Sequence, residues 1–201
     1  MNRKKKNIIY ASLVVIAAII LLCFFPVSQN LGSEKWVKIT ISDTINAPLA
    51  DTWALAGDLD FKGVAGDRKY DNLPEITRTR PFVGNFSKAG DSRIVYFSTG
   101  DTLVESIRVI QGPCKFEYEL TKPSLPLKWF VYKARGAFEY SALGKDKTIV
   151  KWTYFFHQKN LISRFFIQKY IDNTHKAWMG DMLYATKTQT EKAYVSNPVK
   201  K

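Results

Sequence analysis

Two charged residues, Arg93 and Glu105, occur in stretches of the chain that are otherwise rich in apolar and β-branched residues. A charge buried without a partner is very costly, so an inward-facing Arg93 or Glu105 would need the other residue or a ligand. The two stretches are separated by Ser98-Thr99-Gly100-Asp101, whose residue types are typical of a tight turn. A hairpin there would bring Arg93 close to Glu105. The pair is then either a salt bridge that fixes strand register or a site that contacts a ligand.

The only histidines, His157 and His175, are the other residues that could do acid/base or metal chemistry. A third Cys, His or Asp ligand at a suitable spacing is missing, so we expect no metal site. The competing interpretation is that each histidine is a surface or rim residue. The sequence also has no nucleophile elbow, no phosphate-binding loop and no dinucleotide-binding glycine pattern, and we expect no cofactor. Glu105 and His157 remain as candidate general acids or bases.

The element that must position these groups is a C-terminal helix, which we expect over residues 161–192. The stretch contains no Pro, and its apolar residues recur at spacings of three and four. The residues of this stripe are Ile167, Tyr170, Ile171, Thr174, Trp178, Met182 and Ala185. The opposite side is predicted to be solvated and carries Lys169, Lys176, Leu183 and Lys187. A helix of roughly 45 Å needs a broad, curved surface to cover its stripe.

Residues 36–158 supply a surface of this kind. Residues 36–45 alternate apolar and polar side chains and predict a strand. Pro48 suits the first turn of a short helix over 49–57, and a second short helix is expected near 59–64, before a strand around 76–80. Five further β-rich runs are joined by short connections, which indicates antiparallel neighbours. These runs are 91–97, 102–111, 115–121, 129–141 and 148–158. The plan is α+β, with helices on one face of the sheet.

Aromatic residues should line the space between this sheet and the C-terminal helix. The expected set is Tyr118, Trp152, Tyr154, Phe156, Tyr170 and Trp178. Aromatic residues in such an arrangement more often form a packed core without a cavity. A ligand pocket is the alternative, because pockets are mostly apolar with a few polar groups, here Arg93 and Glu105.

The N-terminal part of the chain predicts a membrane anchor. Residues 8–27 form an uncharged apolar run of about the length that spans a bilayer. A cleaved secretory signal is the alternative, but the run is long for one and Phe24-Phe25-Pro26-Val27 offers no convincing cleavage site. The basic cluster in residues 1–7 should stay cytoplasmic, which places the domain on the periplasmic or extracellular side. We divide the rest into a linker (28–35), a domain (36–193) and a basic flexible tail (194–201).

The net charge of the chain is +12, and it has two cysteines, Cys23 and Cys114. After the N-terminal cluster the basic residues are scattered among acidic ones, a pattern that fits a solvated surface near an anionic membrane better than a nucleic-acid footprint. We therefore expect no nucleic-acid partner. Since only Cys114 lies in the domain, no disulfide can form within it, and the redox compartment stays open.

Several short motifs occur in a characteristic order over about 150 residues. They are Ile45-Asn46-Ala47-Pro48, Asp51-Thr52-Trp53, Gly90-x-x-Arg93, Glu105, Tyr118, Gly136 and Thr148-x-x-x-Trp152. On these residues the chain from about 37 to 193 resembles the START-like, or SRPBCC, superfamily, most closely its polyketide cyclase/dehydrase branch. The resemblance implies a helix-grip fold, in which six or seven antiparallel strands wrap the last helix around an apolar cavity.

The resemblance leaves the function open, because the superfamily includes cyclases, lipid carriers and hormone-binding proteins. The first hypothesis is a membrane-anchored domain that binds a hydrophobic small molecule or lipid without catalysis. The second is a cyclase or dehydratase-type enzyme that uses Glu105, His157 or a pocket tyrosine as its acid/base. The third is a scaffold with a filled core.

Overall fold

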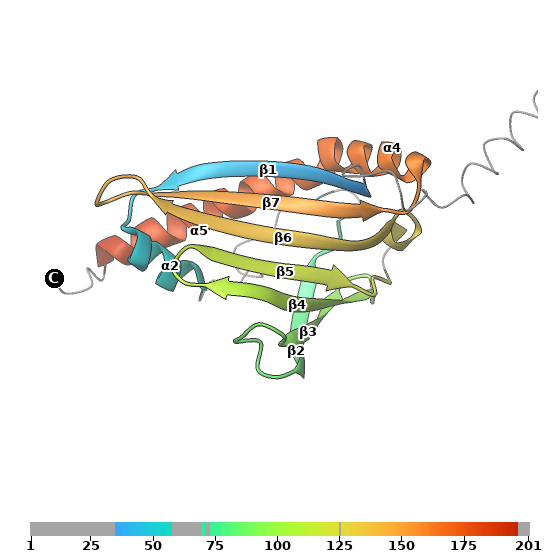
Figure 1. The fold of residues 1–201 in the computed structure, drawn as a ribbon, viewed down its shortest axis with the longest axis horizontal. Coiled ribbons are helices and arrows are strands. Elements are labelled where there is room, and N and C mark those ends of the chain that lie inside the picture. Colours follow the sequence, from blue (N-terminus) through green and yellow to red (C-terminus); the bar gives the residue numbers. More distant parts are fainter. Residues whose placement is uncertain (1–34, 58–69, 71–72, 125, 197–201) are drawn as a thin grey trace, which may run out of the picture.

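The computed structural model describes residues 35–57, 70, 73–124 and 126–196. Seven antiparallel strands form one curved sheet in the order β1-β7-β6-β5-β4-β3-β2 (Figure 1). Short connections join β2 to β3, β3 to β4, β4 to β5 and β6 to β7, and β7 returns beside β1. The strands are β1 Trp36–Ile45, β2 Ile76–Val83, β3 Ser92–Phe97, β4 Thr102–Gln111, β5 Lys115–Thr121, β6 Val131–Ala142 and β7 Thr148–Gln158.

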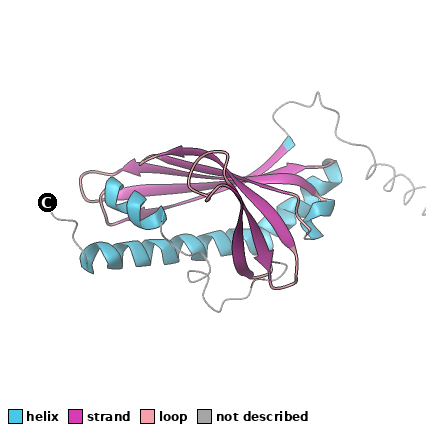
Figure 2. Ribbon diagram, turned by 90° about the horizontal axis from the view of Figure 1, so that it is seen from below, coloured by secondary structure: helices cyan, strands magenta, loops and turns pink. Residues whose placement is uncertain are grey.

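A long helix, which contains one π turn, crosses the inner face of the sheet (Figure 2). It comprises α4 (Leu161–Tyr170), the π turn η3 (Ile171–His175) and α5 (Lys176–Ser196). The Asn160 side chain caps α4 by accepting a hydrogen bond from the Ser163 N–H. The single long helix is confirmed, and at Ser196 it ends four residues beyond the predicted end at residue 192. It therefore includes the first three residues of the predicted tail.

The π turn changes which residues of the helix face the core. It adds one residue to a turn, and this rotates every later side chain around the axis relative to a regular α-helix. His175, Met179 and Leu183 thereby join the buried stripe. The prediction that Leu183 lies on the solvated side is therefore wrong, because a regular 3.6-residue period was assumed across the whole segment.

Two short helices connect the strands. The helix α2 (Leu49–Gly57) follows Pro48 as predicted, and the 3-10 turn η2 (Pro126–Trp129) precedes β6. The Ala47 carbonyl accepts a hydrogen bond from the Thr148 hydroxyl at 2.9 Å, which ties the start of α2 to β7. The second short helix expected near 59–64 lies outside the described residues.

The core is divided into two apolar clusters on the inner face. The larger one joins the long helix to β1, β5, β6 and β7, and it includes Trp152, Phe156 and Met179. The smaller one consists of Val95, Phe97 and Leu103 on β3 and β4. Leu120 and Leu127 pack against both clusters. Side chains between the two clusters therefore lie at the boundary of the region in which the sheet contacts the long helix.

None of the helices in the described part of the chain is long and apolar enough to span a bilayer. The predicted anchor, residues 8–27, lies outside the described residues.

Candidate functional site

Arg93 and Glu105 meet on the inner face of the sheet, as the hairpin pattern predicted. They are direct neighbours in the β3–β4 pairing, and Arg93 Nε lies 2.6 Å from Glu105 Oε2. Glu105 is only 8% exposed, and the Arg93 guanidinium also stacks on the Phe86 ring. Burial raises the pKa of Glu105 above its usual range, although the Arg93 charge and hydrogen bond oppose this rise. Glu105 therefore holds its proton more readily than a surface carboxylate does.

The next row of the inner face places two tyrosines around a glycine. Tyr118 is paired with Gly136 across β5 and β6, and Gly136 is paired with Tyr154 across β6 and β7. A Cβ at position 136 would overlap the Tyr118 ring, so this ring lies directly over the glycine backbone. The rings of Tyr118 and Tyr154 are 6.2 Å apart, and both side chains are buried. Burial raises the pKa of both hydroxyls, so both stay protonated.

His175 approaches this row from the π turn of the helix. Its ring lies 4.5 Å from that of Tyr154 and 5.1 Å from that of Trp178, centroid to centroid. Its Nδ1 is 3.2 Å from the Tyr170 hydroxyl, while its Nε2 is buried and has no hydrogen-bond partner among the described residues. Burial lowers the pKa of His175 to about 3. The expectation of a surface or rim histidine is wrong here, because the π turn directs the ring into the core.

His157 lies on the other face of the sheet. It stands between the inward-facing positions Phe156 and Gln158, and its ring packs against Trp36 at 4.7 Å and Tyr132 at 5.6 Å. Partial burial, followed by the nearby positive charges of Lys133 and Lys35, lowers its pKa. The sheet separates the two histidines, so they do not form the hypothesised acid/base pair. His157 is also excluded as an acid/base inside the predicted cavity.

The remaining predicted cavity residues are buried or partly buried between sheet and helix. The Trp152 ring stacks on Phe138 at 4.7 Å and lies 5.3 Å from the Trp178 ring. Phe156 meets the Tyr170 ring edge to face at 6.2 Å. The predicted contact between the helix stripe and the last strand is thus present.

Together these residues form a polar row inside an apolar core. It runs from the Arg93–Glu105 pair through Tyr118 and Tyr154 to His175. Such groups can donate or accept hydrogen bonds to one small molecule, and Glu105 can exchange a proton. No cluster of three or more metal-ligating side chains exists among the described residues.

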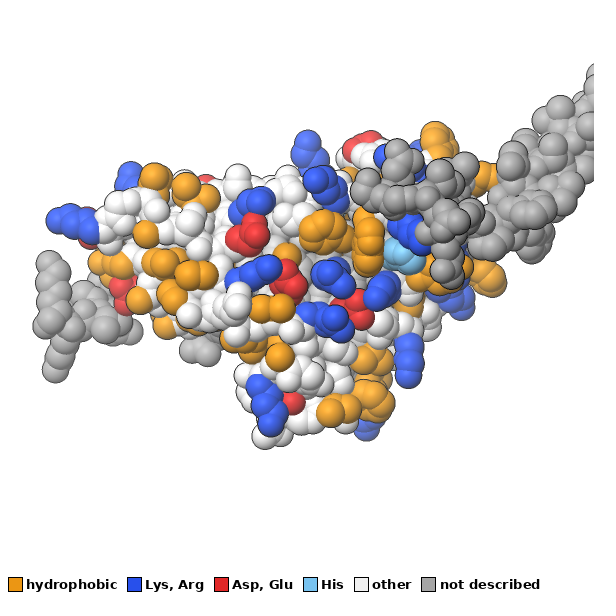
Figure 3. Space-filling model, in the orientation of Figure 1, with side chains coloured by type: hydrophobic (Ala, Val, Ile, Leu, Met, Phe, Trp, Pro, Cys, Tyr) orange, Lys and Arg blue, Asp and Glu red, His pale blue; other side chains and the backbone are white. Residues whose placement is uncertain are grey.

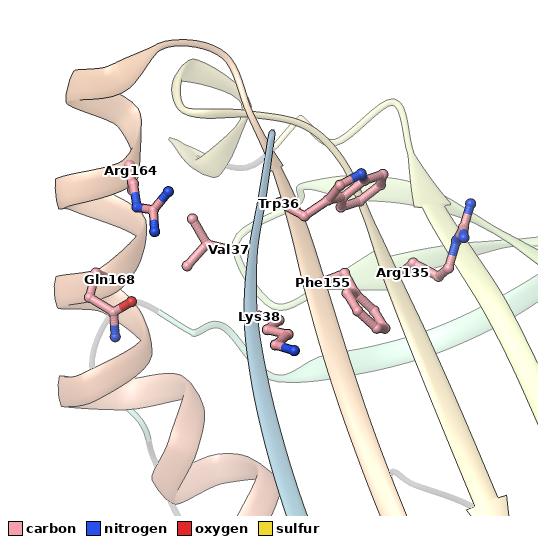
Figure 4. A pocket seen from close by; sticks show the side chains of 7 residues that line it. All are labelled: Trp36, Val37, Lys38, Arg135, Phe155, Arg164 and Gln168. Atoms are coloured by element: carbon pink, nitrogen blue, oxygen red, sulfur yellow. The ribbon is translucent and has the colours of Figure 1, made fainter. Parts of the chain in front are cut away.

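Two hollows lie on the outer face of the sheet and at its β1 edge. The first, of about 550 Å³, wraps around β1 toward α4 (Figure 4). Its lining is Trp36, Val37, Lys38, Arg135, Phe155, Arg164 and Gln168. The second, of about 340 Å³, lies among the ion pairs of β5, β6 and β7, where basic and acidic side chains alternate (Figure 3).

Neither hollow is lined by a residue of the predicted cavity. The cavity between helix and sheet accordingly stays a prediction. Our sequence reasoning missed the outer hollows, although the signal was present in the residues that alternate with the inward-facing ones, such as Lys38 and Phe155.

No model of a known protein family matches the chain. No curated protein matches it either. Solved structures do share its fold. Norcoclaurine synthase from Thalictrum flavum, in complex with dopamine and hydroxybenzaldehyde, aligns with a TM-score of 0.58 and 15% identity over 90% of this chain and 94% of that one.

Two further solved structures show the same likeness. The ginseng major latex-like protein 151 from Panax ginseng aligns with a TM-score of 0.53 and 14% identity, over 79% of this chain and 97% of its own. The protein Ara h 8.0201 gives a TM-score of 0.53 and 15% identity, over 77% and 97%. The chain therefore has the helix-grip fold that its resemblance to the START-like superfamily predicted.

Proposed function

We propose that this protein is a membrane-anchored helix-grip domain that binds a hydrophobic small molecule or lipid between the inner face of its sheet and the long helix. The observation that carries this proposal is the buried polar row from Glu105 to His175. Packing alone needs only apolar side chains at these positions, and burying polar groups costs free energy unless they are satisfied. Glu105 is paired with Arg93, whereas His175 Nε2 is buried and has no partner among the described residues. A mostly apolar ligand with one or two polar atoms would satisfy it and could bond the neighbouring hydroxyls.

The centre of the inner face also favours a ligand. Strand β6 presents its two smallest inward residues there, Ala134 and Gly136, and they lie between the bulky side chains of β5 and β7. The Tyr118 ring covers Gly136 in the present arrangement. A rotamer change of Tyr118 would open a site over these small residues without moving a strand.

The test is the ligand content and binding capacity of the domain, expressed from residue 32 onward. An organic extract should contain a stoichiometric apolar compound by mass spectrometry, and a fluorescent fatty acid should bind and compete with it. Glu105→Gln and Tyr154→Phe keep the shape of the site and should weaken binding. Glu139→Gln and Tyr132→Phe make the same chemical changes on the outer face and should leave binding unchanged. An extract without ligand and a domain that binds no probe would instead favour a filled-core scaffold.

The raised pKa of Glu105 supports a second candidate function, an acid/base enzyme of the cyclase or dehydratase type. In this hypothesis Glu105 donates or accepts the proton, and the Tyr118 hydroxyl holds a substrate oxygen. The carboxylic C=O stretch of Glu105 in infrared difference spectra, identified with Glu105→Gln, should persist above pH 4.5. If the carboxyl is already ionised at pH 4.5, Glu105 is not a proton donor at neutral pH.

We further propose that residues 8–27 anchor the chain with its N-terminus in the cytoplasm, which places the domain on the periplasmic or extracellular side. Cys114 is exposed in the turn between β4 and β5 and offers a direct test. In a Cys23→Ser background, a membrane-impermeant maleimide should label Cys114 in intact cells. Protection of Cys114 until the cells are lysed would place the domain in the cytoplasm.

A further inference from the structure

One end of the domain gathers exposed aromatic side chains. Trp129 on η2 is 70% exposed, Phe165 on α4 is 67% exposed and Tyr132 on β6 is 53% exposed. Phe166 is exposed beside Phe165, with the two rings 5.6 Å apart. These four are the majority of the large exposed aromatic residues in the described chain; the others are Phe82 and Tyr184.

Contacts between neighbouring elements join these residues into one surface. The Phe166 ring packs on Phe130 at 4.8 Å, which links α4 to the segment that follows η2. The Lys159 N–H donates to the Phe130 carbonyl at 3.0 Å, and the Lys159 ammonium lies 5.3 Å from the centre of the Tyr132 ring. We call the surface formed by Lys128, Trp129, Tyr132, Lys159, Arg164, Phe165 and Phe166 the aromatic end.

The aromatic end is basic. Residues 126–135 and 155–171, which form it and its surroundings, contain no Asp or Glu. Lys159 and Arg164 take part in none of the ion pairs between described residues. Hydrogen bonds from Ser124 and Thr99 lower the pKa of Asp101 in the β3–β4 turn, and the nearby positive charge of Lys128 adds to this effect. The charge that faces outward therefore comes mainly from Lys159 and Arg164.

The described chain begins at the same end. Trp36, the first residue of β1, is paired with His157 near the end of β7, and α4 follows three residues after β7 (Figure 1). Only eight residues separate Trp36 from the end of the apolar run at Val27. Fully extended, that stretch reaches about 30 Å. An anchor formed by the apolar run would hold the aromatic end close to the bilayer surface.

We propose that the aromatic end docks on an anionic lipid bilayer. This inference rests on the proposed membrane anchor but not on any ligand inside the fold. Trp and Tyr favour the interface between headgroups and hydrocarbon, and Lys and Arg near an anionic surface each add about 1 kcal/mol of attraction. Docking would also turn the β1 edge, with Lys38 and Arg164 around its hollow, toward the headgroups.

The experiment uses the full chain reconstituted in vesicles, with an environment-sensitive dye on one cysteine. The dye is placed at Phe165→Cys in a background that lacks Cys23 and Cys114, or on the native Cys114 in a Cys23→Ser background. Cys114 directly precedes Lys115, which is aligned through β6 and β7 with Ser42 on β1. Ser42 lies six residues along β1 from Trp36, so Cys114 is roughly 20 Å farther from the aromatic end. In phosphatidylglycerol-containing vesicles the dye at 165 should shift to the blue and be quenched by nitroxide lipids, while the dye at 114 should not.

A charge-reversal pair identifies the residues responsible. Lys159→Glu with Arg164→Glu should lower the ratio of docked to undocked domain by about thirtyfold or more, because removing two such attractions gives thirtyfold and the new carboxylates are also repelled. Lys145→Glu with Lys147→Glu changes the net charge equally in the β6–β7 turn at the far end and should leave the ratio unchanged. The docked fraction should also fall between 0.1 M and 0.5 M salt.

Three outcomes would overturn the proposal. The first is a dye at 165 that reports water in every vesicle. The second is quenching of the dye at 165 that is as strong in phosphatidylcholine vesicles, or in the Lys159/Arg164 variant, as it is for the wild type in phosphatidylglycerol-containing vesicles. The third is a signal that depends on protein density at constant lipid composition, which would mean that a second copy covers the surface. Vesicle flotation and fatty-acid binding are measured on the same samples, so a failure of docking is distinguishable from a failure of the anchor or of the ligand site.

Discussion

The buried histidine on the helix makes the stability of the domain depend on pH. His175 is 3% exposed and surrounded by Tyr154, Phe156, Tyr170 and Trp178, with no charged group in contact. Burial lowers its pKa from 6.5 to about 3. In the unfolded chain the histidine takes up a proton below pH 6.5, whereas in the folded protein it does not. The stabilising effect is therefore complete above pH 6.5 and is lost progressively as the pH falls toward 3.

The size of this effect follows from the two pKa values. Between pH 7.5 and pH 5.0 the unfolded state gains free energy from protonation of His175, and the folded state gains almost none. The difference amounts to about 2 kcal/mol of unfolding free energy, a large part of the stability of an ordinary domain. Other groups also titrate in this range; for example, the raised pKa of Glu105 acts in the opposite direction. A comparison with a variant that lacks only His175 removes their contribution.

The assay is urea unfolding of the domain from residue 32 onward, at pH 7.5 and pH 5.0, with and without His175→Leu. Between pH 7.5 and pH 5.0 the unfolding free energy of the wild type should fall by about 2 kcal/mol more than that of His175→Leu. His157→Leu, on the outer face, serves as the matched control and should change the pH dependence much less. Equal losses in the wild type and His175→Leu, or an NMR titration of the His175 ring near pH 6.5, would refute the reasoning.

The other predictions concern packing and the buried ion pair. Gly136→Ala should lower the unfolding free energy by roughly 1–3 kcal/mol, because the new methyl group displaces the Tyr118 ring. Gly180→Ala, at an open helix position, should raise the unfolding free energy by about 0.5–1 kcal/mol. Thermal melts in which both variants shift the melting temperature in the same direction would contradict the packing of Tyr118 on Gly136. Arg93→Met leaves Glu105 buried without its partner and should lower the unfolding free energy by about 3 kcal/mol. Adding Glu105→Met should restore part of the loss in a double-mutant cycle; a strictly additive result would show that the two side chains do not interact.

Much of the fold could be predicted from the sequence, because the signals are local. Alternating side chains and turn residues located β1, β4, β5 and β7 to the residue, and the absence of Pro with a three-and-four spacing located the long helix. The Arg93–Glu105 pair was also predictable, since a short hairpin fixes which residues lie opposite each other. These features depend only on neighbours in the chain or on one tight turn.

The tertiary structure decided what happens where distant segments meet. The π turn could not be predicted from the three-and-four spacing, and it directs His175 into the core beside Tyr154 and buries Leu183. The alternation with Phe156 already indicates the outer face for His157. Its contacts with Trp36 and Tyr132, however, required knowledge of the β1 and β6 neighbours. The aromatic end required the same knowledge, because the pairing of β6 with β7 brings η2 and the start of β6 beside α4. Sequence patterns carry the period of each element, whereas the relative placement of elements depends on packing energies that no single segment contains.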